Sequence, residues 1–134
     1  MTRVFVHGVP ETSLVWDELR EQVGGDSVAL PLPGFGVPLP DDFVPGSRCI
    51  LGLYRSAIPN VGADWGARAQ TPTSSPGLVL IATGDRVDNE TAARATAERL
   101  GALVAVLPGG THFWMFDSTG TVASVLSSFW SSLP

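Results

Sequence analysis

Lysine is absent from this 134-residue chain, and cysteine and histidine are scarce. The eight basic residues are all arginines, scattered singly between Arg3 and Arg99, so no patch exists to neutralise a run of phosphates. We therefore expect no nucleic-acid partner. The single cysteine, Cys49, excludes an internal disulfide and fits a reducing compartment. The two histidines have no metal-ligand spacing, so we expect no metal site and no cofactor.

Long apolar runs are also missing. No segment approaches the roughly 20 apolar residues of a transmembrane helix. Near the N-terminus, the apolar run before His7 is only Val4–Val6, which is too short for the hydrophobic region of a secretory signal. We expect a cytoplasmic protein without a membrane partner. Hydrophobic residues make up 44% and charged residues 16%, a composition that favours a packed core over disorder. We expect one domain over residues 1–134.

Four short apolar runs predict β-strands, and helical patterns lie between them. The strands are expected at Val4–Val6, Val28–Leu30, Leu78–Ala82 and Leu103–Leu107. Continuous apolar strands alternating with amphipathic helices predict an α/β fold, a Rossmann-like three-layer arrangement with a mostly parallel sheet of about four strands. If strands are missing between the two pairs, the first pair must meet Leu78–Ala82 directly or recruit a second chain.

Three helices are predicted with identifiable starts and stops. The first begins at Thr12 or Ser13 as cap and runs through Arg20, with Leu14, Val15, Leu19 and Val23 facing inward and Gly24–Gly25 ending it. The second runs from an Asp88 or Asn89 cap to Leu100, and the third from Ser118 to Trp130. Residues 48–56 have weak helical character. Residues 31–38 predict a rigid proline-rich loop, and residues 59–76 predict a longer one.

Polar residues and glycines follow the predicted strand ends. His7, Pro33, Asp85 and Gly109–His112 each come directly after a strand. In a parallel sheet these ends share one edge, where open α/β sheets bind ligands. We expect any functional site to lie along that edge.

Four of these loops resemble those of α/β-hydrolases. His7–Thr12 resembles the oxyanion loop of the epoxide hydrolase and haloalkane dehalogenase branch, and Leu32–Gly36 resembles that branch's next loop. Thr83–Asp85 resembles the loop bearing the catalytic acid, and Gly109–Phe113 resembles the loop bearing the catalytic histidine. The four segments occur in the family's order and together predict a reduced α/β-hydrolase.

The resemblance implies roles for four residues. His112 would be the base, Asp85 would orient it, and the backbone at Gly8 and Val9 would supply oxyanion donors. Alternatives from the residues alone stay open, because a lone histidine also caps loops and a Gly-Asp pair commonly forms a turn. His7 is interpreted as a structural residue of its loop.

The segment that should carry the nucleophile is missing. The family places it on a Gly-x-Ser-x-Gly elbow, or on an aspartate version of that motif. Here the chain passes directly from Phe43 to Cys49, with an apparent junction near residues 44–48. Gly62–Gly66 matches the aspartate version and makes Asp64 a possible relocated nucleophile, although no strand or crossover helix flanks it in the sequence.

Two functions therefore remain open. The first is weak hydrolysis of an ester, epoxide or haloalkane, with His112 activating water against a small apolar substrate. The second is a non-catalytic scaffold that binds an apolar ligand or self-associates as a homodimer. A stand-alone Rossmann-like domain is the alternative fold, but no glycine-rich phosphate loop follows either early strand.

Overall fold

The computed structural model describes residues 2–8, 11–33, 35–38, 72 and 74–134. The predictions for Val9, the junction at 44–48, the helix at 48–56 and the Gly62–Gly66 motif with Asp64 lie outside these residues. In the described part, no helix is long and apolar enough to cross a membrane.

All four predicted strands are present, and they run parallel in pairs. Strand β1 (Arg3–Val6) pairs with β2 (Ser27–Leu30), in a register that sets Val4 beside Val28. Strand β5 (Leu78–Ala82) pairs with β6 (Leu103–Leu107), in a register that sets Leu80 beside Ala105. Helices connect the parallel strands of each pair, as an α/β fold requires.

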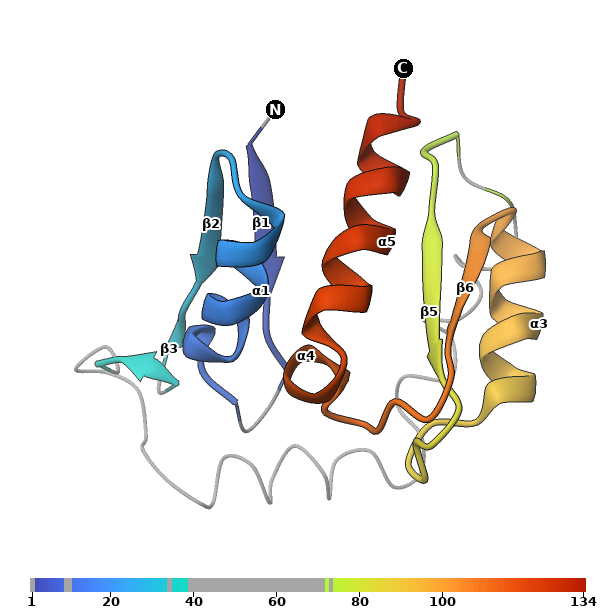
Figure 1. The fold of residues 1–134 in the computed structure, drawn as a ribbon, viewed down its shortest axis with the longest axis horizontal. Coiled ribbons are helices and arrows are strands. Elements are labelled where there is room, and N and C mark those ends of the chain that lie inside the picture. Colours follow the sequence, from blue (N-terminus) through green and yellow to red (C-terminus); the bar gives the residue numbers. More distant parts are fainter. Residues whose placement is uncertain (1, 9–10, 34, 39–71, 73) are drawn as a thin grey trace.

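The two pairs do not join into one sheet within the described residues, so the structure is α/β but the expected single sheet of about four strands is not confirmed. No ladder links β1 or β2 to β5 or β6. Helix α5 (Thr119–Ser131) instead stands between the two pairs (Figure 1). The first pair therefore does not meet Leu78–Ala82 directly.

The core forms where both pairs pack against α5. Phe5 of β1, Leu107 of β6 and Val122 of α5 belong to one buried cluster, to which Leu19 and Ala123 also contribute. Helix α1 (Asp17–Val23) packs on the same helix. Burial of this apolar surface, at about 25 cal/mol per Å², replaces the backbone ladder that the two pairs lack.

The first predicted helix begins differently from the expectation. A 3₁₀ turn, η1 (Ser13–Trp16), precedes α1, and the Thr12 side chain makes no capping hydrogen bond. Leu14 is 69% exposed, so its expected inward position is wrong, while Val15 and Leu19 are buried. The 3₁₀ turn has about three residues per turn instead of 3.6, which shifts the residues that face the core.

The other helices agree with their predicted bounds. Helix α3 (Glu90–Leu100) begins after Asn89, whose side chain accepts a hydrogen bond from the Ala92 N–H. It ends at Gly101, whose left-handed backbone (φ +68°) glycine adopts without strain. A short helix, α4 (Trp114–Asp117), precedes α5.

The described residues between 31 and 38 form no helix, as predicted, but they are not entirely loop. Two-residue strands β3 (Leu32–Pro33) and β4 (Gly36–Val37) pair there. The strands of both main pairs point the same way, and the loops that follow them gather at the lower side of Figure 1. This common edge positions the candidate site.

We predict that Leu19→Ala lowers the free energy of unfolding by about 2–5 kcal/mol, because it opens a cavity in the core cluster. Leu19 is 0% exposed. Leu14→Ala is the matched control from the same segment and should change stability by less than about 0.5 kcal/mol. Urea unfolding measures both, and equal losses would contradict the assigned packing.

Candidate functional site

The turns that follow β5 and β6 are held together by backbone contacts. The Gly84 N–H donates to the Gly110 carbonyl at 2.8 Å, and the Gly109 N–H donates to Thr83 Oγ1 at 2.8 Å. We call this pair of bonds the turn contact. A Cβ added at Gly84 would lie 2.9 Å from the carbonyl oxygens of Gly109 and Gly110. Glycine is therefore required at position 84 for the turns to approach this closely.

Asp85 follows the turn contact, and both of its carboxylate oxygens take part in hydrogen bonds. Its Oδ1 accepts the Val87 N–H at 2.7 Å and the Asp88 N–H at 3.2 Å, in the manner of an Asx turn. The Asp85 side chain is only 6% exposed. Its carboxylate is therefore fixed in orientation, with Oδ2 directed at the neighbouring turn.

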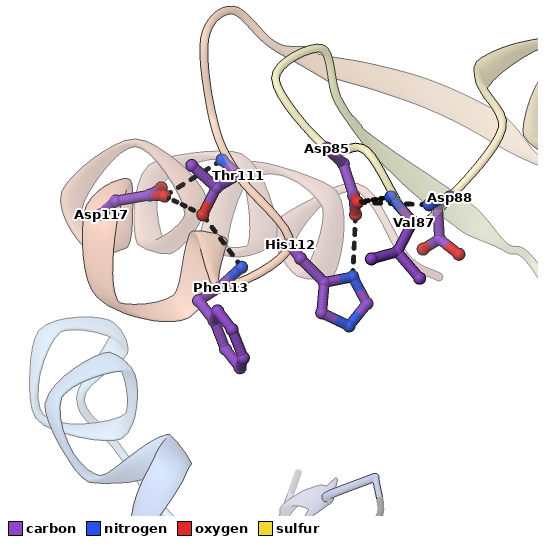
Figure 2. A network of polar contacts seen from close by, with 7 residues as sticks. All are labelled: Asp85, Val87, Asp88, Thr111, His112, Phe113 and Asp117. Carbon is purple, nitrogen blue, oxygen red and sulfur yellow. Dashed lines mark hydrogen bonds and ion pairs between the residues drawn. The ribbon is translucent and has the colours of Figure 1, made fainter.

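His112 lies opposite that oxygen. Its Nδ1 is 2.9 Å from Asp85 Oδ2, and the second ring nitrogen points away from Asp85 (Figure 2). The imidazole is 43% exposed. The two residues that the resemblance implied as base and orienting acid, 27 positions apart in the chain, are thus brought into direct contact.

The loop carrying His112 is anchored at its other end by Asp117. The Asp117 carboxylate accepts hydrogen bonds from the Thr111 N–H, the Thr111 hydroxyl and the Ser118 hydroxyl. Thr111 Oγ1 in turn accepts the Phe113 N–H (Figure 2). His112 is therefore flanked on both sides by residues held at the start of α4.

The contact shifts both pKa values in opposite directions. The hydrogen bond to Asp85 raises the pKa of His112 above its ordinary value, and the charges of Asp85, Asp88 and Glu11 add to the effect. The Val87 backbone hydrogen bond lowers the pKa of Asp85, and the bond to His112 lowers it further. Hydrogen bonds from Thr111 and Ser118 likewise lower the pKa of Asp117.

A pocket of about 180 Å³ opens beside His112. It joins the loop after β1 to the loop after β6, because both Gly8 and His112 line it. Trp16, Phe113, Trp114 and Met115 supply apolar walls, and Glu11 and Asp88 supply carboxylates. Gly8, one of the two implied oxyanion residues, therefore lies at the site, whereas Val9 is outside the described residues.

One pocket residue carries an unsatisfied donor. The Trp16 Nε1 is the buried side-chain polar atom without a hydrogen-bond partner in the described part of the chain. Its ring is held between Phe5 and Trp114, at centroid distances of 5.7 and 5.8 Å. An unpaired buried donor costs about 1–3 kcal/mol, so a water or ligand oxygen that reached it would be stabilising.

His7 has the structural role that the sequence predicted. It is buried, its Nε2 accepts the Leu32 N–H, and its Nδ1 contacts the Gly8 carbonyl at 2.6 Å. Because Nε2 accepts, the proton resides on Nδ1 and donates to that carbonyl. His7 thereby ties the loop after β1 to the start of β3.

Three residues form a group whose side-chain atoms could coordinate a divalent metal ion. The spacing of these residues in the sequence did not predict this group. Donor atoms of Asp85, Asp88 and His112 lie within 4.8 Å of one another. Hydrogen bonding already accounts for this grouping, because both oxygens of Asp85 and Nδ1 of His112 are occupied. The expectation of no metal site stays a prediction.

Sequence reasoning missed Glu11, Trp16 and Asp88 as members of the pocket. Each lies near a loop that was singled out, but no motif marks them. Trp114 lines the pocket and also packs against the core cluster, whereas Trp130 packs on the core. Phe116 is 56% exposed.

Comparison of the chain with known protein families, with curated proteins and with solved structures finds no match in any of the three.

We predict that Asp85→Asn lowers the pKa of His112 toward its ordinary value of 6.5, because the amide carries no charge. Its oxygen should keep the Val87 and Asp88 N–H groups, so that an NH2 group takes the place of the accepting Oδ2. NMR titration of the two histidines measures this. Asp26→Asn, which alters an exposed carboxylate bonded to Thr2, should leave the His112 pKa unchanged. Equal pKa values for His112 in the parent chain and Asp85→Asn would contradict the contact.

The same shifts set the pH dependence of stability. The raised pKa of His112 contributes stability that is complete below 6.5 and is lost as pH rises through the folded-state value. The lowered pKa of Asp85 contributes stability above 3.8 that is lost as pH falls through its folded-state value. The contact is therefore strongest in the acidic to neutral range.

We predict that Gly84→Ala separates the two turns, lowering both the stability and the His112 pKa. The added methyl meets two carbonyl oxygens at 2.9 Å. Gly120→Ala in α5 is the control, since its Cβ would be 3.4 Å from the flexible Gln22 side chain. That control should stabilise the helix by up to about 1 kcal/mol. An unchanged His112 pKa in Gly84→Ala would show that the turn contact does not position the imidazole.

Proposed function

We propose that the chain is a reduced α/β-hydrolase-type protein in which His112, oriented by Asp85, acts as a general base on water. The observation that carries the proposal is the 2.9 Å contact between His112 Nδ1 and Asp85 Oδ2. A carboxylate at Nδ1 retains the proton there and leaves the lone pair on Nε2, the form that a general base requires. The exposed imidazole at the edge of a pocket gives water access to it.

The substrate class follows from the pocket and the base. Four apolar side chains, those of Trp16, Phe113, Trp114 and Met115, favour a small apolar ester, epoxide or haloalkane. For an ester, the water oxygen attacks the carbonyl carbon while its proton passes to His112 Nε2. The same proton then returns to the departing alkoxide, so acid and alcohol are released and the imidazole is regenerated.

The rate is expected to be low. General-base assistance contributes about 10²–10⁴-fold, and the sequence contains no Gly-x-Ser-x-Gly elbow to supply a serine nucleophile. The raised pKa of His112 also leaves a larger protonated, inactive fraction near neutral pH. Activity should therefore rise with pH through the His112 pKa, since the neutral imidazole is the base.

The second proposed function is a non-catalytic scaffold that binds a small apolar ligand. The two tryptophans that line the pocket, one with an unpaired N–H, favour this alternative. Quenching of tryptophan fluorescence by the ligand, in the absence of turnover, would distinguish it from the hydrolase. The reducing compartment inferred from the single Cys49 fits either function.

We predict that His112→Ala lowers hydrolysis of p-nitrophenyl acetate or styrene oxide by about 10²–10⁴-fold, to the background rate. Asp85→Asn should lower the rate and move the pH–rate profile to lower pH, because the His112 pKa falls. Asp26→Asn should match the parent chain.

Turnover that persists in His112→Ala would refute the hydrolase proposal. Loss of activity in Asp64→Asn with the fold intact, judged by circular dichroism, would instead assign attack to a carboxylate and replace the direct water mechanism.

A further inference from the structure

The edge of β5 that faces away from β6 carries backbone N–H groups without partners among the described residues. The Leu103 N–H donates to the Gly77 carbonyl, and the Thr83 N–H donates to the Leu107 carbonyl. Odd-numbered residues from 77 to 83 therefore turn their backbone groups toward β6. Because strand residues alternate, Leu78, Leu80 and Ala82 turn their N–H groups to the other edge. Among the described residues no strand pairs with that edge.

A cavity of about 330 Å³ lies along this edge. Four successive strand residues, Val79–Ala82, line it. Their side chains alternate between the two faces of the sheet, so a space that contacts all four must wrap around the edge. Ala92, Ala93 and Thr96 of α3 flank the cavity, and Trp114 closes it from another element. Its walls therefore extend beyond β5 and leave a slot where a further strand would lie.

The sequence of β5 carries none of the features that protect free edges. Leu78–Ala82 contains no charge and no proline, which edge strands commonly use to prevent pairing. A fully apolar strand is typical of the middle of a parallel sheet, with neighbours on both sides. This composition points to an edge that is covered by another strand.

We propose that β5 pairs with β5 of a second copy of this chain, antiparallel and about a two-fold axis. Leu80 then lies opposite Leu80 of the second copy, and the pair exchanges two backbone hydrogen bonds. The Ala82 N–H of each copy reaches the Leu78 carbonyl of the other. The two β5–β6 pairs become one sheet of four strands. This dimer does not depend on the proposed hydrolase activity.

The distribution of acidic residues along the slot favours the antiparallel orientation of the two β5 strands. Asp85, Asp88 and Glu90 line one end of the slot, and the described lining residues include no basic side chain. Parallel pairing of two β5 strands would bring the two acidic ends together, at a cost from like-charge repulsion. Antiparallel pairing sends them to opposite ends, and it is also the arrangement that a two-fold axis generates.

Sedimentation velocity combined with hydrogen–deuterium exchange tests the proposal on the full chain. We expect the mass to rise from 14.1 kDa to twice that value as the concentration increases from micromolar upward. The Leu78, Leu80 and Ala82 amides should exchange more slowly as the dimer forms. The Val79 and Ile81 amides, bonded to β6, should be protected at every concentration and serve as the internal control.

Leu80→Pro removes one edge N–H and should leave the chain monomeric. Val106→Pro is the matched control, because it alters the outer edge of β6 and should preserve the dimer. If Leu80→Pro fails to fold, the exchange experiment decides alone.

Three outcomes would overturn the proposal. A monomer with fast-exchanging edge amides would show an empty edge, and a monomer with protected edge amides would show that the chain covers it itself. A dimer with unchanged edge exchange would place the interface elsewhere.

Discussion

The hydrogen bond from the Gly84 N–H to the Gly110 carbonyl is the constraint on which the candidate site depends. It holds the turns after β5 and β6 at a separation that only glycine at position 84 permits. Asp85 and His112 follow these turns and meet as a consequence. The chemistry of the site is thus set by backbone geometry before any side chain contributes.

The division of the strands into two pairs is the other main feature of the fold. Without a ladder between β1 and β5, the two halves are joined through the core that Phe5, Leu107 and Val122 form around α5. Their contact is therefore hydrophobic and side-chain mediated. The pocket beside His112 spans the two halves, since Gly8 belongs to one and His112 to the other.

Periodicity and glycine positions predicted the strands, the helix capped by Asn89 and the loops that carry polar residues, because these are local properties. The separation of the sheet could not be predicted, since strand pairing depends on which edges meet in space. Leu14 was misplaced because a 3₁₀ turn, which changes the helical phase, replaces the first turn of the expected α-helix. Glu11, Trp16 and Asp88 join the site through tertiary contacts that no spacing encodes. Asp85 and His112 were singled out by the resemblance of their loops to those of α/β-hydrolases, and both loops follow adjacent parallel strands.

A fixed tautomer is the property that connects the structure to function, whether His112 activates water or only organises the pocket. Long-range ¹H–¹⁵N correlation of the histidine rings, above the His112 pKa, measures it directly. We predict that neutral His112 carries its proton on Nδ1, bonded to Asp85, with Nε2 unprotonated. A neutral ring protonated on Nε2, or one that averages rapidly between the two forms, would contradict the central claim that Asp85 orients this imidazole.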